Sequence, residues 1–222
     1  MRAYVRVVLV ALFAVAASSA QANPILLFNT GLTGEGSVDP NYQLISGPTC
    51  PLPPCAAFVT VDDAFPIGPR WMVNSATSKW IEPLSGTTDI HPAGTYIYRT
   101  TFDLTGLDPL TASISGGWAV DDGGPNILIN NIPTGQINTT GFGAFTPFMI
   151  TSGFLLGINT LDFVVTNAVQ ATFNPTGLRV EMTGTADPKA PTPVPGPATV
   201  TLVTAGLGAL LAARRRRHAQ RS

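Results

Sequence analysis

The sequence predicts an all-β domain, an antiparallel β-sandwich or barrel, between two terminal targeting segments. From residue 23 to residue 187 there is no amphipathic helical stretch of useful length, and apolar residues instead alternate with a period of two between turn signals. The 22 Gly and 20 Pro of the 222 residues are spread along the chain as punctuation. Many short strands in one domain are typical of a sandwich or barrel.

The first strands are expected at residues 25–28 and 58–61. The clearest strand is 94–104, where five residues share one face: Tyr96, Tyr98, Thr100, Phe102 and Leu104. Residues 111–120 repeat this pattern, and their common face consists of Ala112, Ile114, Gly116, Trp118 and Val120. Both faces are predicted to lie in the core.

A turn is expected over residues 121–126 (Asp-Asp-Gly-Gly-Pro-Asn), because Gly adopts positive φ and Asp or Asn bonds its own backbone. The chain returns as a strand at 127–129. Further strands are expected at 145–151, 159–166 and 178–183.

The N-terminus has the pattern of a secretory signal peptide over residues 1–22. Arg2 and Arg6 precede an apolar run over residues 7–17, and Ala20-Gln-Ala22 forms an A-x-A cleavage site. We therefore expect export through the Sec machinery and cleavage after Ala22.

The C-terminus has three parts in a fixed order. Residues 189–197 are a Pro-rich linker, residues 198–213 are uncharged and apolar, and residues 214–222 are a basic tail. A helix of 16 residues rises about 24 Å, against a hydrocarbon core of roughly 30 Å, and snorkelling arginines could reduce the deficit. The segment predicts a single transmembrane helix with a cytoplasmic tail, because basic residues stay inside.

This C-terminus resembles the PEP-CTERM sorting signal of exported proteins in Gram-negative bacteria that make exopolysaccharide. The residues that carry the resemblance are Val194, Pro195, Gly196, Pro197, Ala198, Thr199, Arg214, Arg215, Arg216 and Arg217. In that family the motif usually reads Val-Pro-Glu-Pro, so Gly196 replaces the glutamate. The resemblance implies recognition by an exosortase, an inner-membrane-anchored precursor, and a final place at the cell surface or in the extracellular matrix. The alternative is a plain C-terminal membrane anchor.

The charges are sorted along the chain although the net charge is only −1. Two of the 12 basic residues lie in the signal peptide and five in the last nine residues, while the middle holds the other five and all 13 acidic residues. The exported domain is therefore acidic, with a net charge of about −8. An acidic domain argues against nucleic acid as a partner.

Residues 94–182 resemble a galactose-binding-like jelly roll, a module that accompanies many glycoside hydrolases. The resemblance rests on the order of the segments 98–104, 117–122, 127–130 and 157–161, followed by Asn167. Asn131 stands where such hairpins usually have Gly. The pattern implies a fold more than a ligand.

The two cysteines, Cys50 and Cys55, enclose four residues, a spacing that differs from the C-x-x-C redox motif. In an exported chain they are expected to form a disulfide. No second Cys pair or His cluster suggests a structural metal site.

Catalytic candidates are few. His91 is the one histidine of the exported domain, and neither a G-x-S-x-G elbow nor an H-E-x-x-H motif occurs. Carboxylates could form a glycosidase pair, drawn from Asp62, Asp63, Glu82, Asp121, Asp122 and Glu181. Adjacent acids in a strand point to opposite faces, so neither Asp doublet is expected to act as a pair. Calcium at Asp121 and Asp122 is an alternative to simple turn chemistry.

The remaining hypothesis is glycan binding. Trp71 and Trp80 flank a Ser/Thr-rich stretch and are expected to be more open than Trp118. The residues that could contact a glycan are Trp71, Trp80, Arg99, Asp121, Asp122 and Asn126. Three functions follow for the exported domain: a non-catalytic envelope or matrix protein associated with exopolysaccharide, a lectin-like module, or a glycan-active hydrolase. The first is favoured, because no catalytic set is complete.

Overall fold

The computed structural model describes residues 21–61, 65–86, 90–190 and 206–207. The chain divides into two compact units, Met1–Lys189 and Ala190–Ser222. The predicted signal peptide, sorting motif and membrane span lie outside the described residues, apart from Gln21, Ala22 and the helical pair Gly206 and Leu207. No helix within the described ranges has the length and apolar character that crossing a membrane requires.

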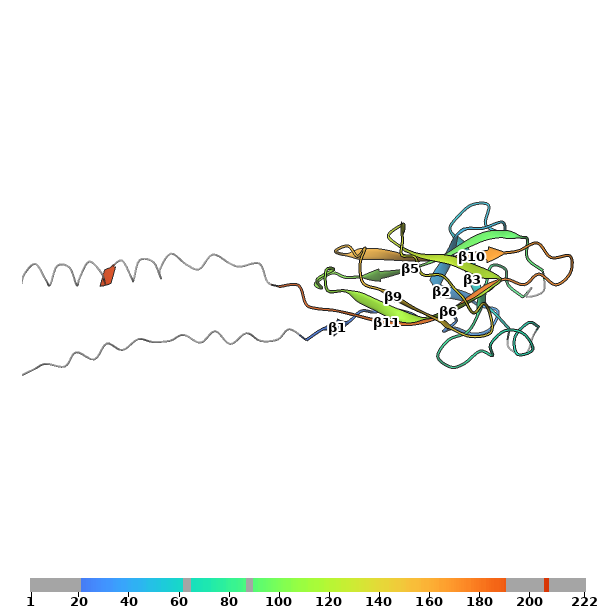
Figure 1. The fold of residues 1–222 in the computed structure, drawn as a ribbon, viewed down its shortest axis with the longest axis horizontal. Helices are drawn as coiled ribbons and strands as arrows, with labels where there is room; N and C mark the ends of the chain where they lie inside the picture. The colour runs from blue at the N-terminus through green and yellow to red at the C-terminus, as the bar shows by residue number, and fades with distance from the viewer. Residues whose placement is uncertain (1–20, 62–64, 87–89, 191–205, 208–222) are drawn as a thin grey trace, which may run out of the picture. The chain divides into compact units, whose positions relative to one another are not determined.

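The described part of the first unit is all-β (Figure 1). Eleven strands form one antiparallel sheet in the order β8-β7-β10-β5-β2-β3-β4-β11-β6-β9, and β1 pairs with β11. The strands are Asn23–Pro24 (β1), Val38–Ser46 (β2), Cys55–Val59 (β3), Ile81–Glu82 (β4), Gly94–Asp103 (β5), Ser113–Asp121 (β6), Gly123–Ile129 (β7), Ile132–Pro133 (β8), Thr146–Ile150 (β9), Ile158–Asn167 (β10) and Gly177–Ala186 (β11).

The sheet curls until its two halves face each other, because aromatic rings from distant strands meet in one core. The ring of Phe163 on β10 lies 5.8 Å from that of Trp118 on β6 and 6.0 Å from that of Phe148 on β9. The residues of this core all lie between Ile25 and Ala186. The domain therefore contains its own core, and its architecture agrees with the predicted all-β, sandwich-like class.

The predicted core faces of β5 and β6 are confirmed. On β5 the side chains of Tyr96, Tyr98, Thr100 and Phe102 are buried, and every residue of β5 pairs with one of β10. On β6 and just before it, the buried residues are Ala112, Ile114, Trp118 and Val120. Alternation predicted these positions because each strand has one face on the core.

Strand β2 was not predicted, and its irregular pairing explains why. Pro40 lies inside it and has no N–H to donate. The pairing of β2 with β3 accordingly shifts register between Val38 and Gln43. A segment that contains a proline can therefore still form a strand when the proline lies at a bulge.

The predicted strand at 25–28 is wrong, because the regular pairing of β1 ends at Pro24. The chain still follows β11 through isolated backbone hydrogen bonds, such as that from Thr30 N to the carbonyl of Val180 (3.1 Å), and side chains add further bonds. Met182 N donates to Asn29 Oδ1 (2.9 Å), and Val180 N donates to Thr30 Oγ1 (3.0 Å). Short polar side chains thus supplement the sparse backbone hydrogen bonds along this segment.

The predicted turn over 121–126 is also wrong, since β6 ends at Asp121 and β7 begins at Gly123. The glycines serve close packing here. A Cβ atom at Gly124 would lie 2.5 Å from the ring of Trp118. Gly124 therefore lets β7 pass over the indole, and the change of direction falls on Asp122.

The next turn joins β7 to β8 through Asn130 and Asn131, whose φ angles are 50° and 66°. Both values belong to the left-handed region, which Asn tolerates better than most residues. Ile129 pairs with Ile132 across this two-residue loop. Asn130 and Asn131 thus form the whole of this two-residue turn.

The predicted disulfide between Cys50 and Cys55 is confirmed. It closes a Pro-rich surface loop that leads into β3. Such a bond stabilises chiefly by restricting the unfolded chain.

Replacing both Cys50 and Cys55 by Ser should lower the free energy of unfolding by about 2 kcal/mol, the loop-closure value for so short a loop. Urea denaturation of residues 23–189 measures the change. Reductant should produce the same loss in the wild-type domain and none in the double variant. Equal stability of the two proteins without reductant would contradict the prediction.

Candidate functional site

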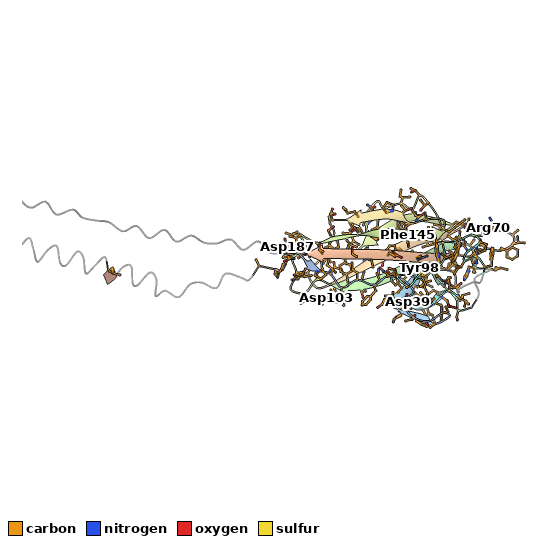
Figure 2. All side chains as sticks on the ribbon, turned by 90° about the horizontal axis from the view of Figure 1, so that it is seen from below. Asp39, Arg70, Tyr98, Asp103, Phe145 and Asp187 are labelled. Atoms are coloured by element: carbon orange, nitrogen blue, oxygen red, sulfur yellow. A yellow bond between two sulfur atoms is a disulfide. The ribbon has the colours of Figure 1, made fainter. Side chains whose placement is uncertain are left out.

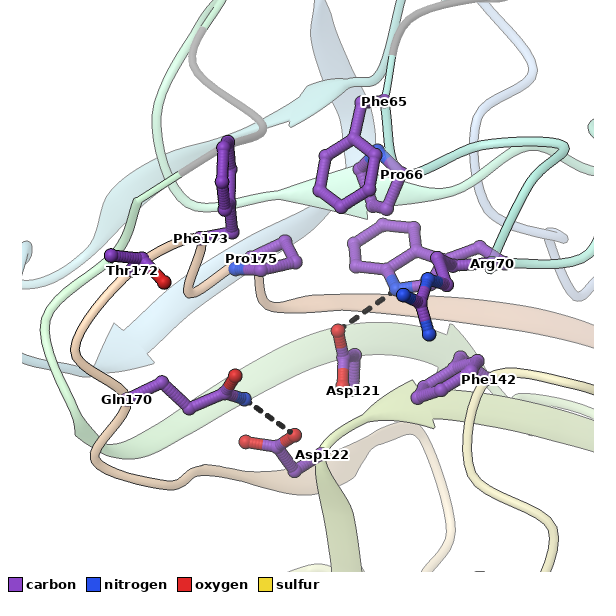
Figure 3. A pocket seen from close by; sticks show the side chains of 11 residues that line it. Phe65, Pro66, Arg70, Asp121, Asp122, Phe142, Gln170, Thr172, Phe173 and Pro175 are labelled. Atoms are coloured by element: carbon purple, nitrogen blue, oxygen red, sulfur yellow. Dashed lines mark hydrogen bonds between the residues drawn. The ribbon is translucent and has the colours of Figure 1, made fainter.

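A cleft of about 530 Å³ opens at the end of the sheet where β6 passes into β7 (Figure 3). The segment before β4 and the loop between β10 and β11 form its walls, together with Phe142. The lining residues are Phe65, Pro66, Arg70, Trp71, Asp121, Asp122, Phe142, Gln170, Thr172, Phe173 and Pro175. Aromatic rings and prolines thus surround two adjacent carboxyl groups.

Trp71 forms part of a rigid wall. Its ring packs on that of Trp80 at 4.4 Å between centroids, and both belong to a second core cluster with Ile67 and Ala119. Trp80 Nε1 donates to the carbonyl of Met72 (2.8 Å), so the Trp80 indole is fixed as well. The stack holds the Trp71 indole edge at the cleft.

Arg179 of β11 fixes the segment that carries these tryptophans. Its buried guanidinium donates to Ser78 Oγ (2.7 Å), to Ser75 Oγ (3.0 Å) and to the carbonyl of Val73. The charged group also lies 5.2 Å from the ring centroid of Phe145. A loop without regular pairing is in this way attached to the sheet by charge-assisted hydrogen bonds.

Asp121, the last residue of β6, lies on the floor of the cleft and is only 4% exposed. Trp71 Nε1 donates to its Oδ2 at 2.8 Å. Thr176 Oγ1 donates to its backbone carbonyl at 2.6 Å, which ties the strand end to the opposite wall. Both walls therefore hold this residue in position.

Asp122 faces the same cleft, although strand alternation predicted opposite faces for the two acids. The prediction is wrong because Asp122 lies between β6 and β7, outside either strand. Its Oδ2 accepts from the Ala168 N–H (2.7 Å), and its Oδ1 accepts from Gln170 Nε2 (3.4 Å; Figure 3). Period-two alternation holds only within a continuous strand.

The pKa of the Asp121 carboxyl is raised from 3.8 to about 7, chiefly by burial. A hydrogen bond with the Asp122 carboxyl and repulsion by its charge contribute to this rise, while the bond from Trp71 opposes it. The charge on the floor of the cleft therefore changes close to neutral pH.

The outer wall is aromatic and is anchored from behind. The rings of Phe65 and Phe173 meet edge to face with 5.6 Å between centroids. Asn174 Nδ2 donates to the carbonyls of His91 and Ala168, each at 3.0 Å. His91 is thus a buried loop residue that supports the wall through its backbone.

The structure gathers three of the six predicted glycan contacts, Trp71, Asp121 and Asp122, in one place. The expectation that Trp71 and Trp80 are open is wrong, since they are 2% and 0% exposed. Polar neighbours in the sequence suggested exposure, but Arg179 draws those neighbours inward.

None of the other three predicted contacts lines the cleft, and two of them, Arg99 and Asn126, serve other parts of the sheet. Arg99 forms an ion pair with Asp162 (2.6 Å) and donates to Asn131 Oδ1 (3.0 Å). Asn126 Oδ1 accepts from the Gly135 N–H (3.1 Å). Both side chains stabilise the part of the sheet formed by β5, β10 and β7, together with the hairpin that follows β7.

Two further carboxylates considered for a glycosidase pair are engaged elsewhere. Glu82 is fully buried, with its Oε2 3.9 Å from His91 Nε2. Glu181 accepts from Ser78 Oγ at 2.7 Å. Asp62 and Asp63 lie outside the described residues. Within the part of the chain that the structure describes, the cleft carboxyls are those of Asp121 and Asp122.

Calcium at Asp121 and Asp122 stays a prediction. The described ranges contain no group of three or more His, Cys, Asp or Glu side chains arranged for a metal ion. Two carboxyls alone would leave most of the six to eight oxygen ligands of Ca²⁺ to carbonyls and water.

Several lining residues were not predicted, chiefly Phe65, Arg70, Phe142, Gln170 and Phe173. All lie in irregular segments, where no periodicity assigns a side chain to a face. The available signal was the presence of large aromatic residues in loops. Phe173 in particular is 61% exposed.

Comparison with family models, with curated proteins and with solved structures finds no match.

We expect the raised pKa of Asp121 to appear in stability. A carboxyl whose pKa rises on folding stabilises the native state at low pH, and this contribution is lost as the pH rises through the native value. The free energy of unfolding should therefore fall between about pH 4 and pH 7, and Asp121→Asn should flatten that fall.

Urea titrations at several pH values measure this slope. Asp103→Asn, which removes an exposed carboxyl, is the matched control. Burial also raises the pKa of Asp39, so part of the slope should remain in the Asp121 variant. An unchanged slope in Asp121→Asn would contradict the assigned pKa.

Proposed function

We propose that this chain is an exported, non-catalytic envelope or matrix protein whose β-domain binds a saccharide of exopolysaccharide in the cleft. The observation that carries the proposal is the combination of aromatic walls and paired carboxyls in one open cleft. Binding sites commonly join apolar surface to a few placed polar groups in this way.

The cleft suits the two surfaces of a sugar ring. The C–H face of a pyranose is apolar and can pack on Phe65, Phe173 and the Trp71 edge. Ring hydroxyls can donate to carboxylate oxygens, which accept several hydrogen bonds each. Gln170 adds an amide that can both donate and accept.

The spacing of the acids favours binding over hydrolysis. A glycosidase places its two carboxyls about 5 Å or more apart, with the scissile bond between them. Asp121 and Asp122 are adjacent and share a hydrogen bond, which leaves no such space. We therefore assign them to ligand recognition.

The fold and the terminal segments support the export part of the proposal. The curled sheet and the Asn130–Asn131 hairpin are consistent with a galactose-binding-like jelly roll. The disulfide suits an oxidising compartment outside the cytoplasm. Residues 1–22 and 189–222 supply the export signal, the linker, the anchor and the exosortase-type sorting signal.

Phe173→Ala should weaken retention of residues 23–189 on the host exopolysaccharide about tenfold, or about 1.4 kcal/mol. The exposed ring would lose its contact with the sugar face. A binding isotherm on immobilised polysaccharide measures the change. Leu110→Ala is the matched control, because Leu110 is 90% exposed and lies near the start of β6, at the opposite end from Asp121. Equal affinity of the Phe173 variant and wild type would contradict the proposal.

The sorting proposal predicts processing near Pro197. In a host that has an exosortase, the mature protein should begin at Asn23 and lack the arginine cluster 214–217. Intact-mass spectrometry of the protein from the cell surface measures both ends. A mature protein that retains these arginines would instead indicate a permanent anchor.

A further inference from the structure

The rings around the cleft form a partial aromatic cage. Phe65 and Phe173 stand together at one end of the cleft, and Phe142 lies beside the two carboxyls (Figure 3). The face of an aromatic ring is negative, so a cation near it is stabilised by about 0.5 to 2 kcal/mol. The edge-to-face contact between Phe65 and Phe173 fixes the orientation of the two rings relative to each other.

The polar groups of the cleft accept more hydrogen bonds than they donate. Asp121 Oδ2 receives one bond from Trp71, and the oxygens of Asp122 receive bonds from Ala168 N and Gln170. Each carboxylate has about four lone-pair positions. Acceptor capacity therefore remains for a ligand that brings several N–H donors.

The charges facing the cleft are those of Asp121, Asp122 and Arg70 among the described residues. Both carboxyls belong to the floor, and the side chain of Arg70 belongs to an exposed residue. The floor is therefore acidic and partly desolvated, while the single positive charge has access to water. Because charges interact more strongly in a less polar environment, the carboxyl groups of the floor should attract or repel a ligand more strongly than the solvated Arg70 guanidinium does.

Resting on the function proposed above, we propose that the cleft selects saccharides that carry a protonated amine, such as partly de-N-acetylated amino-sugar polymers. An ammonium group brings three donors to the carboxyl floor and a charge to the aromatic walls. A neutral glycan lacks the charge, and a uronic acid meets like charges. The cleft would therefore bind amino sugars most tightly, neutral sugars less tightly and uronic acids most weakly.

The ranking should depend on pH. Asp121 gains its negative charge as the pH rises through about 7. A ligand amine with a pKa near that of an α-amino group, about 7.7, begins to lose its charge just above this value. Affinity for the amino sugar should accordingly rise from pH 5.5 to about pH 7 and fall at higher pH.

Isothermal titration of residues 23–189 at pH 7 tests the proposal with three hexasaccharides: a glucosamine oligomer, its fully N-acetylated form and a galacturonate oligomer. We expect the glucosamine oligomer to bind about tenfold more tightly than the acetylated form, a difference of about 1.4 kcal/mol. We expect the galacturonate oligomer to bind most weakly.

Two cleft variants should change this preference in opposite directions. Asp122→Asn should reduce the preference for the amine severalfold, and Arg70→Ala should increase it. Asp103→Asn removes the same charge at the other end of the domain from Arg70 (Figure 2) and should leave the preference unchanged.

Equal affinity for the glucosamine and acetylated oligomers, with both weakened by Phe173→Ala, would overturn the amine preference and leave saccharide binding standing. A preference lost equally in Asp103→Asn and Asp122→Asn would overturn it as general electrostatics. Failure of all three oligomers to bind would overturn the proposed function together with the inference.

Discussion

The packing of β6 between its neighbours is the constraint on which the structure depends. Trp118 of β6 packs against Phe163 in the core, and this packing requires the backbone of the neighbouring strands to lie close to β6. A Cβ at Gly124 would collide with the Trp118 ring, and one at Gly116 would lie 2.1 Å from the carbonyl oxygen of Glu181. Because protein interiors are close-packed, a side chain at either position would force the neighbouring strands apart. These glycines therefore fix how closely β6 packs against its neighbours. The end of β6, and with it the acidic floor of the cleft, is placed by the same packing.

The cleft also depends on a buried charge far from it in sequence. Arg179 holds the segment between Trp71 and Trp80 by hydrogen bonds, and this segment presents the indole that donates to Asp121. With these hydrogen bonds made, the buried Arg179 guanidinium fixes one conformation of the loop. The site is thus built from irregular segments held on a regular sheet, a common arrangement for binding residues.

The regular part of the fold could be predicted from the sequence, because alternation along β5, β6 and β10 reports which side chains face the core. The irregular part could not. Trp71 and Trp80 lie among polar residues that would normally accompany exposure, yet Arg179 recruits those residues from 100 or so positions away in the chain. Asp122 escaped the alternation rule because the turn is a single residue. Long-range hydrogen bonding and turn geometry of this kind leave no periodic signal in one sequence.

The most direct test of saccharide binding in the cleft is the indole N–H spectrum of the domain. The three tryptophans give three such signals, and only Trp71 donates to a cleft carboxyl. We expect saccharide added to residues 23–189 to shift the Trp71 indole N–H resonance, while those of Trp80 and Trp118, which do not line the cleft, stay in place. A Trp71 resonance that does not move at saturating saccharide would contradict binding in this cleft.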